Sequence, residues 1–418
     1  MNRLLSASLL VLVPALAAAA PRTFDVTVHA GKYDRQNDPV TVIVTLPADL
    51  AKGPVHLDDS TGQPIPCQLT DLSLLARPAK VPEGQVQREV HFILPALKAG
   101  EMAHYKLTVG GTQSRTEAGF RVVDKTGAYS EILFKDRPIL RYMCQPIDES
   151  SKEKRELTYK VYHHVYDPAG TRIVTKGPGG LYTHHRGLFY AFNKVIYGDG
   201  KQCDIWHCPV ASQQHEKILA TETGPVLARQ RVQIGWHGVA KEVFAREERE
   251  LTVYNVPGGT LIEFASLLRT ENGPIKLDGD PQHAGFQFRA ANEVAGKESA
   301  KQTYYLRPDG KGEMGATRNW DPKTREGPVN LPWDAMSFVL GGKRYTVAYL
   351  NSPQNPKESR FSERDYGRFG CYFEYDLTAE HPLVVNYRIW LQDGEMTGDQ
   401  VAALYEAFAH PPRIIVKK

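Results

Sequence analysis

VLARQRVQIGW, residues 226–236, alternates apolar and polar side chains, and two similar stretches follow it, ERELTVYNV (248–256) and TLIEFASLLRT (260–270). A period of two places successive side chains on opposite faces of a β-strand. The PGG at 257–259 between the second and third stretches is a turn signal. Together these features predict neighbouring antiparallel strands.

The same pattern extends over most of the chain. It includes TFDVTVHAG (23–31) and VTVIVTL (40–46) near the N-terminus, and it continues from Phe120 to VVNYRIWLQ (384–392). We predict an all-β protein with a small β-sandwich over 21–115 and a larger antiparallel sandwich over 116–418, joined at GGTQSRTEAG (110–119). The one convincing helix is TGDQVAALYEAFAH (397–410), with Thr397 as its cap.

The N-terminus and the overall charge restrict location and partners. Arg3, an apolar run from Leu4 to Leu16 and the small residues before Pro21 predict a signal peptide over 1–20, and hence a periplasmic or secreted protein that is soluble after cleavage. No later stretch is long and apolar enough to span a membrane. The 51 Lys and Arg nearly balance the 48 Asp and Glu, which argues against a nucleic-acid partner.

A first candidate site is the segment THHRG, residues 183–187. In a strand, His184 and Arg186 would share one face and His185 would occupy the other. In a turn, which the nearby glycines favour, all three side chains would converge on one pocket. Histidine transfers protons near neutral pH and arginine binds carboxylates, so the segment indicates acid/base chemistry. The competing interpretation is a backbone-bonded histidine beside an ion-paired arginine.

Further candidates lie in three later segments. DIWHCPVASQQHEK (204–217) supplies Trp206, His207 and His215. DPQHAGFQFR (280–289) supplies His283 and Arg289, and SERDYGRFG (362–370) supplies Arg364, Asp365 and Tyr366. No P-loop, nucleophile elbow or dinucleotide fingerprint is present, and no histidine spacing matches a strong zinc motif, so we predict no cofactor and no metal. If a metal is bound, His184, His185, His207 and His215 are the first expected ligands.

Several of these motifs recur in order in a known group. HVYDPAG (164–170), GPGGLYTHHRGLF (177–189), DIWH (204–207), DPQHAGFQFR, SPQNPKESRFSERDYGRFG (352–370) and VVNYRIWLQDGE (384–395) resemble secreted bacterial proteins labelled PmoA-like, or methane oxygenase-like. The resemblance implies a β-supersandwich of the galactose-mutarotase type, a scaffold of sugar epimerases, polysaccharide lyases and carbohydrate-binding proteins. The label names a membrane-spanning oxygenase subunit, which this chain cannot be.

The preferred interpretation is a secreted carbohydrate-active enzyme, a lyase, hydrolase or epimerase, acting by acid/base chemistry on a glycan or uronate-containing sugar. The expected catalytic residues are His184, His185, Arg186, His283 and Tyr366, and the expected substrate-binding residues are Trp206, His207, His215, Arg289, Trp333, Arg364 and Asp365. One alternative is a non-catalytic glycan-binding protein that uses Trp206, Trp333 and Tyr366 as stacking platforms. Another is a metal-dependent enzyme that uses the histidines.

Overall fold

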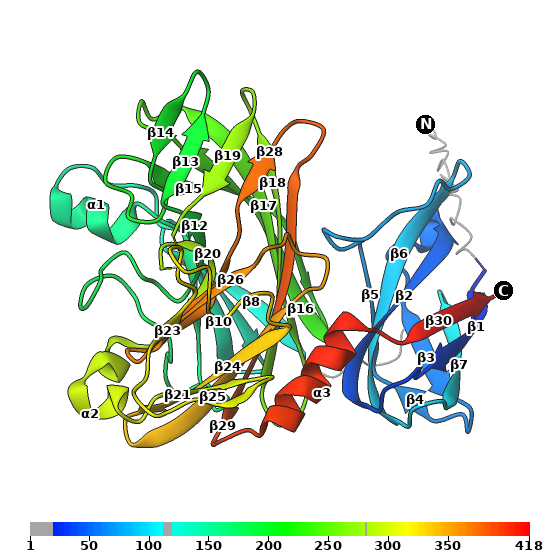
Figure 1. Ribbon diagram of the computed structural model, residues 1–418. Helices are drawn as coiled ribbons and strands as arrows, with labels where there is room; N and C mark the ends of the chain where they lie inside the picture. The colour runs from blue at the N-terminus through cyan, green and yellow to red at the C-terminus, as the bar shows by residue number, and fades with distance from the viewer. Residues whose placement is uncertain (1–19, 112–118, 281) are drawn as a thin grey trace, which may run out of the picture.

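The computed structural model describes residues 20–111, 119–280 and 282–418, and the chain forms two β-rich lobes with a helix between them (Figure 1). All strand pairs in this part of the chain are antiparallel, so the predicted all-β class is confirmed. The predicted signal peptide, apart from Ala20, lies outside the described residues, as does most of the predicted linker. None of the described helices is long and apolar enough to cross a membrane.

The smaller lobe is a sandwich of two sheets. One sheet has the order β30 (Arg413–Lys417), β1 (Arg22–His29), β7 (Met102–Val109), β3 (Val55–Asp59) and β4 (Pro64–Ile65). The other has the order β2 (Arg35–Pro47), β6 (Gln85–Leu97) and β5 (Cys67–Thr70). The side chains of β2 alternate between buried and more exposed from Asp38 to Val44, as a sheet with one face in the core requires.

The last strand of the chain belongs to this smaller lobe. Residues 413–417, which the sequence analysis places in the larger domain, form β30 and pair with β1 from Asp25↔Lys417 to His29↔Arg413. Ile414 and Val416 pack against the core of the smaller sandwich. The backbone N–H and C=O groups on the free edge of β1 are thereby paired, which keeps this edge from pairing with another chain.

The larger lobe contains two nine-stranded sheets around one extended core. The first sheet, which carries the candidate site, has the order β23 (Arg318–Asn319), β26 (Arg360–Arg364), β27 (Arg368–Tyr372), β20 (Ala284–Arg289), β12 (Leu188–Phe192), β11 (Tyr162–Val165), β10 (Arg137–Met143), β9 (Tyr129–Phe134) and β8 (Phe120–Lys125).

The second nine-stranded sheet contains the stretches that open the sequence analysis, which lie side by side as predicted. Its order is β15 (Ser212–Thr223), β16 (Leu227–His237), β17 (Val243–Tyr254), β18 (Thr260–Thr270), β29 (Leu383–Asp393), β25 (Lys343–Asn351), β24 (Trp333–Leu340), β21 (Tyr304–Arg307) and β22 (Gly310–Lys311). A four-stranded sheet adds β14 (Lys201–Cys203), β13 (Lys194–Tyr197), β19 (Ile275–Asp278) and β28 (Tyr375–Leu377).

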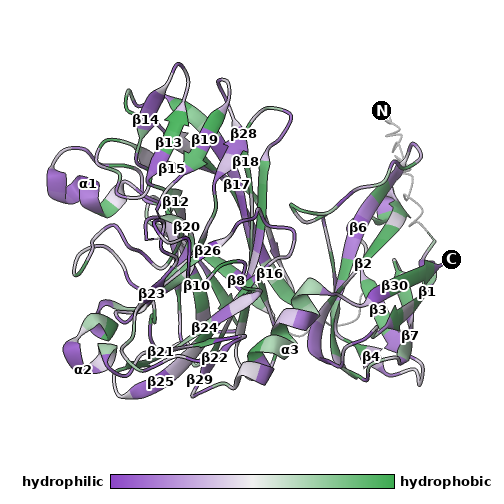
Figure 2. Cartoon of the chain, in the orientation of Figure 1, coloured by the Kyte–Doolittle hydropathy of each residue, from purple (hydrophilic) through white to green (hydrophobic). Residues whose placement is uncertain are grey.

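The predicted C-terminal helix is confirmed as α3 (Gly398–Ala409). The Thr397 side chain accepts a hydrogen bond from the Gln400 N–H, and the Gln400 side chain accepts one from the Thr397 N–H, which makes a capping box. The sequence analysis did not predict the short helices α1 (Lys152–Thr158) and α2 (Lys297–Ala300), or 3₁₀ turns at Ala48–Leu50 and Asn292–Ala295. Figure 2 shows α1 and α2 as mostly hydrophilic.

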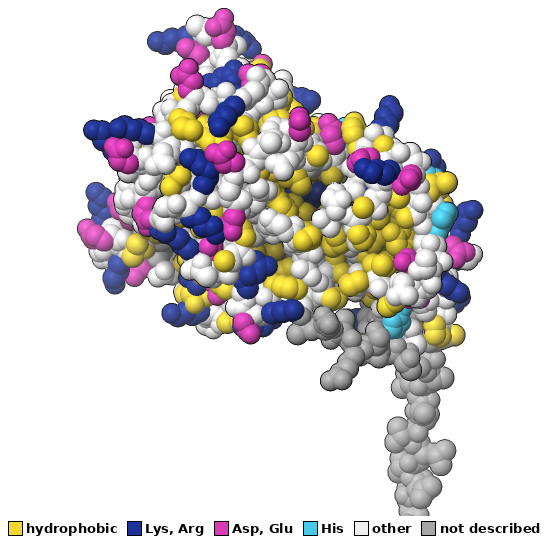
Figure 3. Space-filling model, turned by 90° about the horizontal axis from the view of Figure 1, so that it is seen from below, with side chains coloured by type: hydrophobic (Ala, Val, Ile, Leu, Met, Phe, Trp, Pro, Cys, Tyr) yellow, Lys and Arg dark blue, Asp and Glu magenta, His cyan; other side chains and the backbone are white. Residues whose placement is uncertain are grey.

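Side chains from both lobes meet between them. Arg229 on β16 pairs with Glu89 on β6 at 3.0 Å, and Gln68 on β5 accepts hydrogen bonds from the Val226 and Leu227 N–H groups. A cleft of about 410 Å³ adjoins Arg229 and is bordered by residues such as Leu75, Glu250 and Phe408. The face in Figure 3 is hollowed between the lobes, with hydrophobic side chains along the hollow.

Candidate functional site

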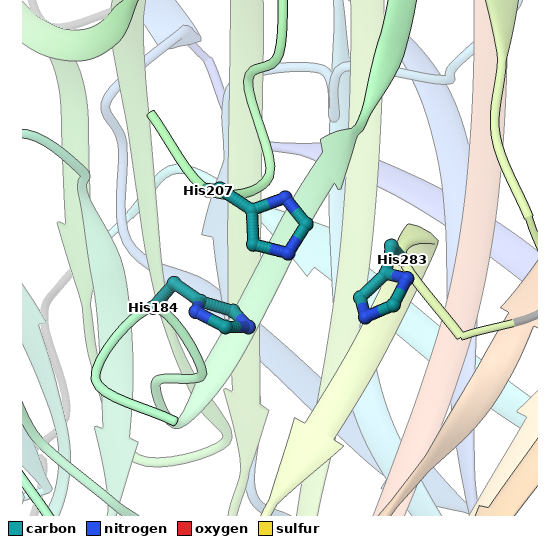
Figure 4. A group of neighbouring side chains, drawn as sticks. All are labelled: His184, His207 and His283. Atoms are coloured by element: carbon teal, nitrogen blue, oxygen red, sulfur yellow. The ribbon is translucent and has the colours of Figure 1, made fainter. Parts of the chain in front are cut away.

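Three histidines from separate segments meet on the first nine-stranded sheet (Figure 4). His184 lies in the loop before β12, His207 follows β14, and His283 immediately precedes β20. Strand β12 pairs with β20 from Leu188↔Phe288 to Phe192↔Ala284, so His283 sits at the end of β20 far from Leu188. The loop before β12 must therefore fold back along the strands to carry His184 to His283.

Gly187 permits this sharp turn into β12. Its φ is +35°, a backbone conformation that side chains with a Cβ rarely adopt. A Cβ at Gly187 would also collide with the carbonyl oxygen of His163 on the neighbouring strand β11. The local sequence HHRG thus joins a folded-back loop to a buried strand.

The ring nitrogens of the three histidines form a compact donor set. Each ring contributes one nitrogen to a set of three in which every pair of nitrogens lies within 4.8 Å. The centroid of the His184 ring is 4.4 Å from that of His207 and 6.4 Å from that of His283, and the His207 and His283 centroids are 4.9 Å apart. We call these three residues the histidine triplet. Imidazole nitrogens converging in this way suit a metal ion.

Aspartates orient two members of the triplet in the same way. Asp204 Oδ2 lies 2.7 Å from His207 Nδ1, and its Oδ1 accepts the His207 backbone N–H at 2.7 Å. Asp280 Oδ1 lies 2.8 Å from His283 Nδ1, and its Oδ2 accepts a hydrogen bond from Asn193. A carboxylate on Nδ1 leaves Nε2 free and fixes the tautomer that can bind a metal there.

The electrostatics of the site reflect its burial. Burial raises the pKa of Asp280, but hydrogen bonds from His283, the Gln282 N–H and Asn193 outweigh it, and the pKa falls to about 2. Burial, followed by the charge of Lys160, lowers the pKa of His184 to about 2. Burial and the nearby Arg368 hold the pKa of His185 well below its usual range. His184 and His185 are therefore neutral at ordinary pH and are weak bases.

His185 and Tyr366 lie directly beside the triplet. The His185 ring is 4.4 Å from that of His184 and stacks at 6.2 Å on that of Tyr366. Both ring nitrogens of His185 are buried, and neither has a hydrogen-bond partner in the part of the chain that the structure describes. Tyr366 also contacts Tyr182, with ring centroids 5.3 Å apart, and its hydroxyl accepts a hydrogen bond from Arg368 Nε at 3.4 Å.

Arg186 has a different role from the predicted catalytic one. Its guanidinium donates to the carbonyl oxygens of Glu156 and Leu157 in the last turn of α1, and it lies 4.3 Å from the centre of the Tyr159 ring. All three of its nitrogens are occupied by backbone oxygens, including that of Thr183. Arg186, which has no exposed surface, therefore anchors α1 to the loop.

Two predicted stacking platforms are wrong. Trp206 is completely buried between Phe189 and the ring of His185, and Trp333 is buried in the core beneath α3. An indole with no exposed face cannot stack on a sugar ring. The expectation failed because the composition of DIWHC does not reveal which residue of the turn faces inward.

The remaining predicted residues divide between the site and its surroundings. Arg289 contacts Tyr366, with its guanidinium carbon 5.0 Å from the ring centre. Asp365 accepts the Tyr366 backbone N–H at 2.9 Å, and the Arg364 N–H is bonded to the Tyr305 hydroxyl. His215 lies on β15, outside the triplet, where its Nδ1 is 3.2 Å from the Tyr142 hydroxyl. His215 is therefore not placed to share a ligand with the triplet.

Sequence reasoning missed two buried cations near the site, Lys160 and Lys176. Lys160 Nζ donates to the carbonyl oxygens of Trp206 and His184, and Lys176 Nζ donates to those of Gly177, Tyr182 and His185. Isolated lysines in the stretches TYKVYHH and VTKGPGG carry no motif, so only the fold reveals their position.

Comparison with known proteins gives a family and a weak structural similarity. A search of curated proteins finds no match. An α-mannosidase from Enterococcus faecalis V583 is 9% identical with a TM-score of 0.46, and a glycosyl hydrolase family 38 protein from E. faecalis is 10% identical with the same score. The matches cover 95% of this chain but only 46% and 47% of those chains. Similarity this low says nothing about what this chain binds or converts.

The family comparison is more extensive. Residues 129–406, more than half of the chain, match a model described as a family of unknown function, and the match gives no support to the PmoA-like label. The matched span contains the histidine triplet, both orienting aspartates and Tyr366. On this match, the chain belongs to the family of unknown function DUF6807.

Proposed function

We propose that the protein is a metal-dependent enzyme whose ion is held by the histidine triplet. The observation that carries the proposal is the convergence of three imidazole nitrogens within 4.8 Å, two of them on rings oriented by Asp204 and Asp280. Three histidines with a further open position form a common donor set of catalytic zinc sites. The metal alternative of the sequence analysis is therefore the one we prefer, with His283 in place of His185 and His215.

The spacing of the nitrogens fits a metal after a small adjustment. Tetrahedral ligands about 2.0–2.1 Å from a zinc ion are about 3.3 Å apart. The triplet nitrogens lie within 4.8 Å of one another, so modest rotations of the rings close the difference. A bound divalent ion supplies Lewis-acid chemistry to an oxygen atom of the substrate.

The neighbouring side chains have separate tasks in this proposal. Asp204 and Asp280 hold the Nδ1 protons of His207 and His283. The Tyr366 hydroxyl, which receives a hydrogen bond from Arg368, is the candidate for proton transfer to or from the substrate. His185 is less suited to this task, because it is 2% exposed.

For the substrate we retain the class predicted from the sequence, a glycan or uronate-containing sugar. The support is the pair of tyrosine rings at the edge of the site, since 47% of Tyr182 is exposed and it contacts the ring of Tyr366. Aromatic faces pack on the C–H groups of sugar rings. We also retain the proposal that the protein is exported.

Metal analysis tests the proposed centre directly. The full chain purified without chelator is analysed for metals and is then loaded with Co²⁺, whose visible absorption reports coordination by histidine. We expect one ion per chain, and we expect His207→Ala and His283→Ala to lose it. Asp204→Asn should weaken binding by about 10- to 100-fold, because it disturbs the orientation of His207.

His215→Ala is the matched control, since it removes a histidine of the same lobe that lies outside the triplet. It should bind the ion as the wild-type protein does. The proposal fails if the purified chain neither contains nor takes up a stoichiometric ion, or if His215→Ala and His207→Ala bind Co²⁺ equally well.

A further inference from the structure

Four buried cationic side chains surround the loop of His184 and His185. Arg289 and Arg368 have no exposed surface, and Lys160 and Lys176 are each 2% exposed. Lys160 and Lys176 contact the backbone oxygens of His184 and His185, at 3.4 and 3.2 Å, and the two arginines contact Tyr366. They therefore share one neighbourhood with the histidine triplet.

None of these four cations has an acidic partner in the described part of the chain. The lysines donate only to backbone carbonyl oxygens. Arg289 donates to the carbonyl oxygens of Ala290 and Tyr366, and Arg368 donates to the Gln287 amide oxygen and the Ser362 and Tyr366 hydroxyls. Asp204 and Asp280 are engaged by histidines.

Such a concentration of buried positive charge is costly without an anion. A charge removed from water must recover its lost hydration through a partner of opposite sign. A metal ion on the triplet would add still more positive charge. Burial lowers the pKa of Lys176 to about 7 and that of Arg289 to about 10. The positive charge of Arg289 lowers the pKa of Lys176 further, as expected for neighbouring cations without an anion between them.

Arg289 supplies the binding geometry. Its Nη1 is occupied by the two carbonyl oxygens, whereas its Nε and Nη2 are buried and have no partner among the described residues. Nε and Nη2 form one edge of the planar guanidinium, and their two N–H groups point in parallel toward the same side. That edge matches the two oxygens of a carboxylate, or two oxygens of a phosphate or sulfate.

We propose that Lys160, Lys176, Arg289 and Arg368 form an oxyanion subsite beside the histidine triplet, with the Nε/Nη2 edge of Arg289 as its specific contact. The inference rests on the proposed function and narrows its substrate to an acidic sugar, whose negative group binds here while the reacting part faces the triplet. The Tyr366 ring packs against the Arg289 guanidinium, so this tyrosine borders both the subsite and the triplet. Because Nε and Nη2 are buried, neighbouring side chains must shift to admit the ligand.

Calorimetric titration of the full chain tests the subsite with four probes: galacturonate, its neutral counterpart galactose, inorganic phosphate and inorganic sulfate. We expect galacturonate to bind at least about tenfold more tightly than galactose, since hydrogen bonds to a charged group discriminate by that amount or more. Preferential binding of phosphate or sulfate over galacturonate also supports the subsite and assigns the oxyanion to that source. Equal affinity for galacturonate and galactose, with no binding of phosphate or sulfate, overturns it.

Variants locate the binding within the fold. Arg289→Gln should lose at least about tenfold in affinity for the preferred anion. Arg289→Lys keeps the positive charge but lacks the paired N–H groups of the guanidinium, so it should lose part of the affinity for the anion. Arg269→Gln is the matched control, because it removes one exposed arginine of the same lobe that pairs with Glu248, and it should bind as the wild type does. Unchanged anion affinity in a folded Arg289→Gln protein, judged by its thermal melt, overturns the assignment to Arg289.

Metal content measured on the same samples separates the two proposals. Arginine-dependent anion binding in a chain that takes up no metal leaves the subsite standing and removes the metal centre. A stoichiometric metal in a chain that binds none of the three anions leaves the metal centre standing and removes the subsite. Should Arg289→Gln and Arg289→Lys both fail to fold, the selectivity of the wild-type chain among the four probes still decides the proposal.

Discussion

Arg229 and Arg289 are both buried arginines on strands of the larger lobe, 3% and 0% exposed, yet their surroundings are opposite. Arg229, at the junction with the smaller lobe, lies 3.0 Å from Glu89, 3.3 Å from Glu222 and 3.7 Å from Glu250. Arg289, beside the histidine triplet, has only carbonyl oxygens. The buried arginine at the junction therefore has three carboxylate partners, whereas the one at the candidate site has no carboxylate partner among the described residues.

The largest effect that tests this contrast is expected at the junction. Arg229→Met removes the cation that Glu89, Glu222 and Glu250 share, and in the described part of the chain only Glu250 keeps another arginine, Arg231. Breaking a buried ion pair from one side commonly costs about 3–5 kcal/mol, and we expect a loss of that size in the free energy of unfolding measured by urea denaturation. Arg269→Met on the exposed surface is the control. A loss no greater than that of the control would mean that the junction does not depend on this pairing.

A smaller effect concerns pH and Lys176. Burial and the nearby Arg289 lower its pKa to about 7 in the folded chain, against an ordinary value near 10.5. Between these values the unfolded chain binds one proton more than the folded chain, so this lysine makes the unfolding free energy rise with pH, by at most about 1.4 kcal/mol per pH unit.

Urea denaturation at pH 7.5, 8.5 and 9.5 measures this contribution. Lys176→Met should remove it and give a flatter dependence on pH than the wild type, whereas the exposed Lys301→Met should keep the wild-type dependence. If the unfolding free energies of the wild type and Lys176→Met depend on pH in the same way, the pKa of Lys176 is not lowered in the folded chain.

The smallest effect is expected for Arg289→Met, the counterpart of the substitution at Arg229. The variant loses hydrogen bonds to two carbonyl oxygens but also removes a buried charge that no acid compensates. We expect the unfolding free energy to change by less than about 1 kcal/mol in urea. A loss as large as that of Arg229→Met would contradict the contrast and make Arg289 a structural residue.

The fold was predictable where apolar and polar side chains alternate along a strand. The stretch at 226–236 and its two successors alternate because one side of their sheet packs on the core, and they became β16, β17 and β18. LFYAF, residues 188–192, is buried at every position and shows no alternation, so only its aromatic composition indicated a strand. The return of β30 to the smaller lobe depends on a contact between the two ends of the chain, which no local pattern encodes.

The sequence predicted one pocket shared by the segments of His184, His283 and Tyr366, but it did not predict the donor set of three histidines. The segments around His184, His207 and His283 were recognised, but a search for local ligand spacing could not combine single histidines from three loops. A usable signal was present in the repeated pattern Asp-x-x-His, at Asp204 with His207 and at Asp280 with His283. In both copies the carboxylate bonds the Nδ1 of the histidine three residues later.

The pairing of β30 with β1 also bears on how the protein is made. Strand β1 is synthesised before the larger lobe, but β30, which covers its free edge, is synthesised after it. Until then the smaller lobe exposes an unpaired, partly apolar strand edge, the kind of surface on which chains aggregate. Completion of the first lobe therefore waits for residues Arg413–Lys417, and a chain truncated before Arg413 would leave that edge open.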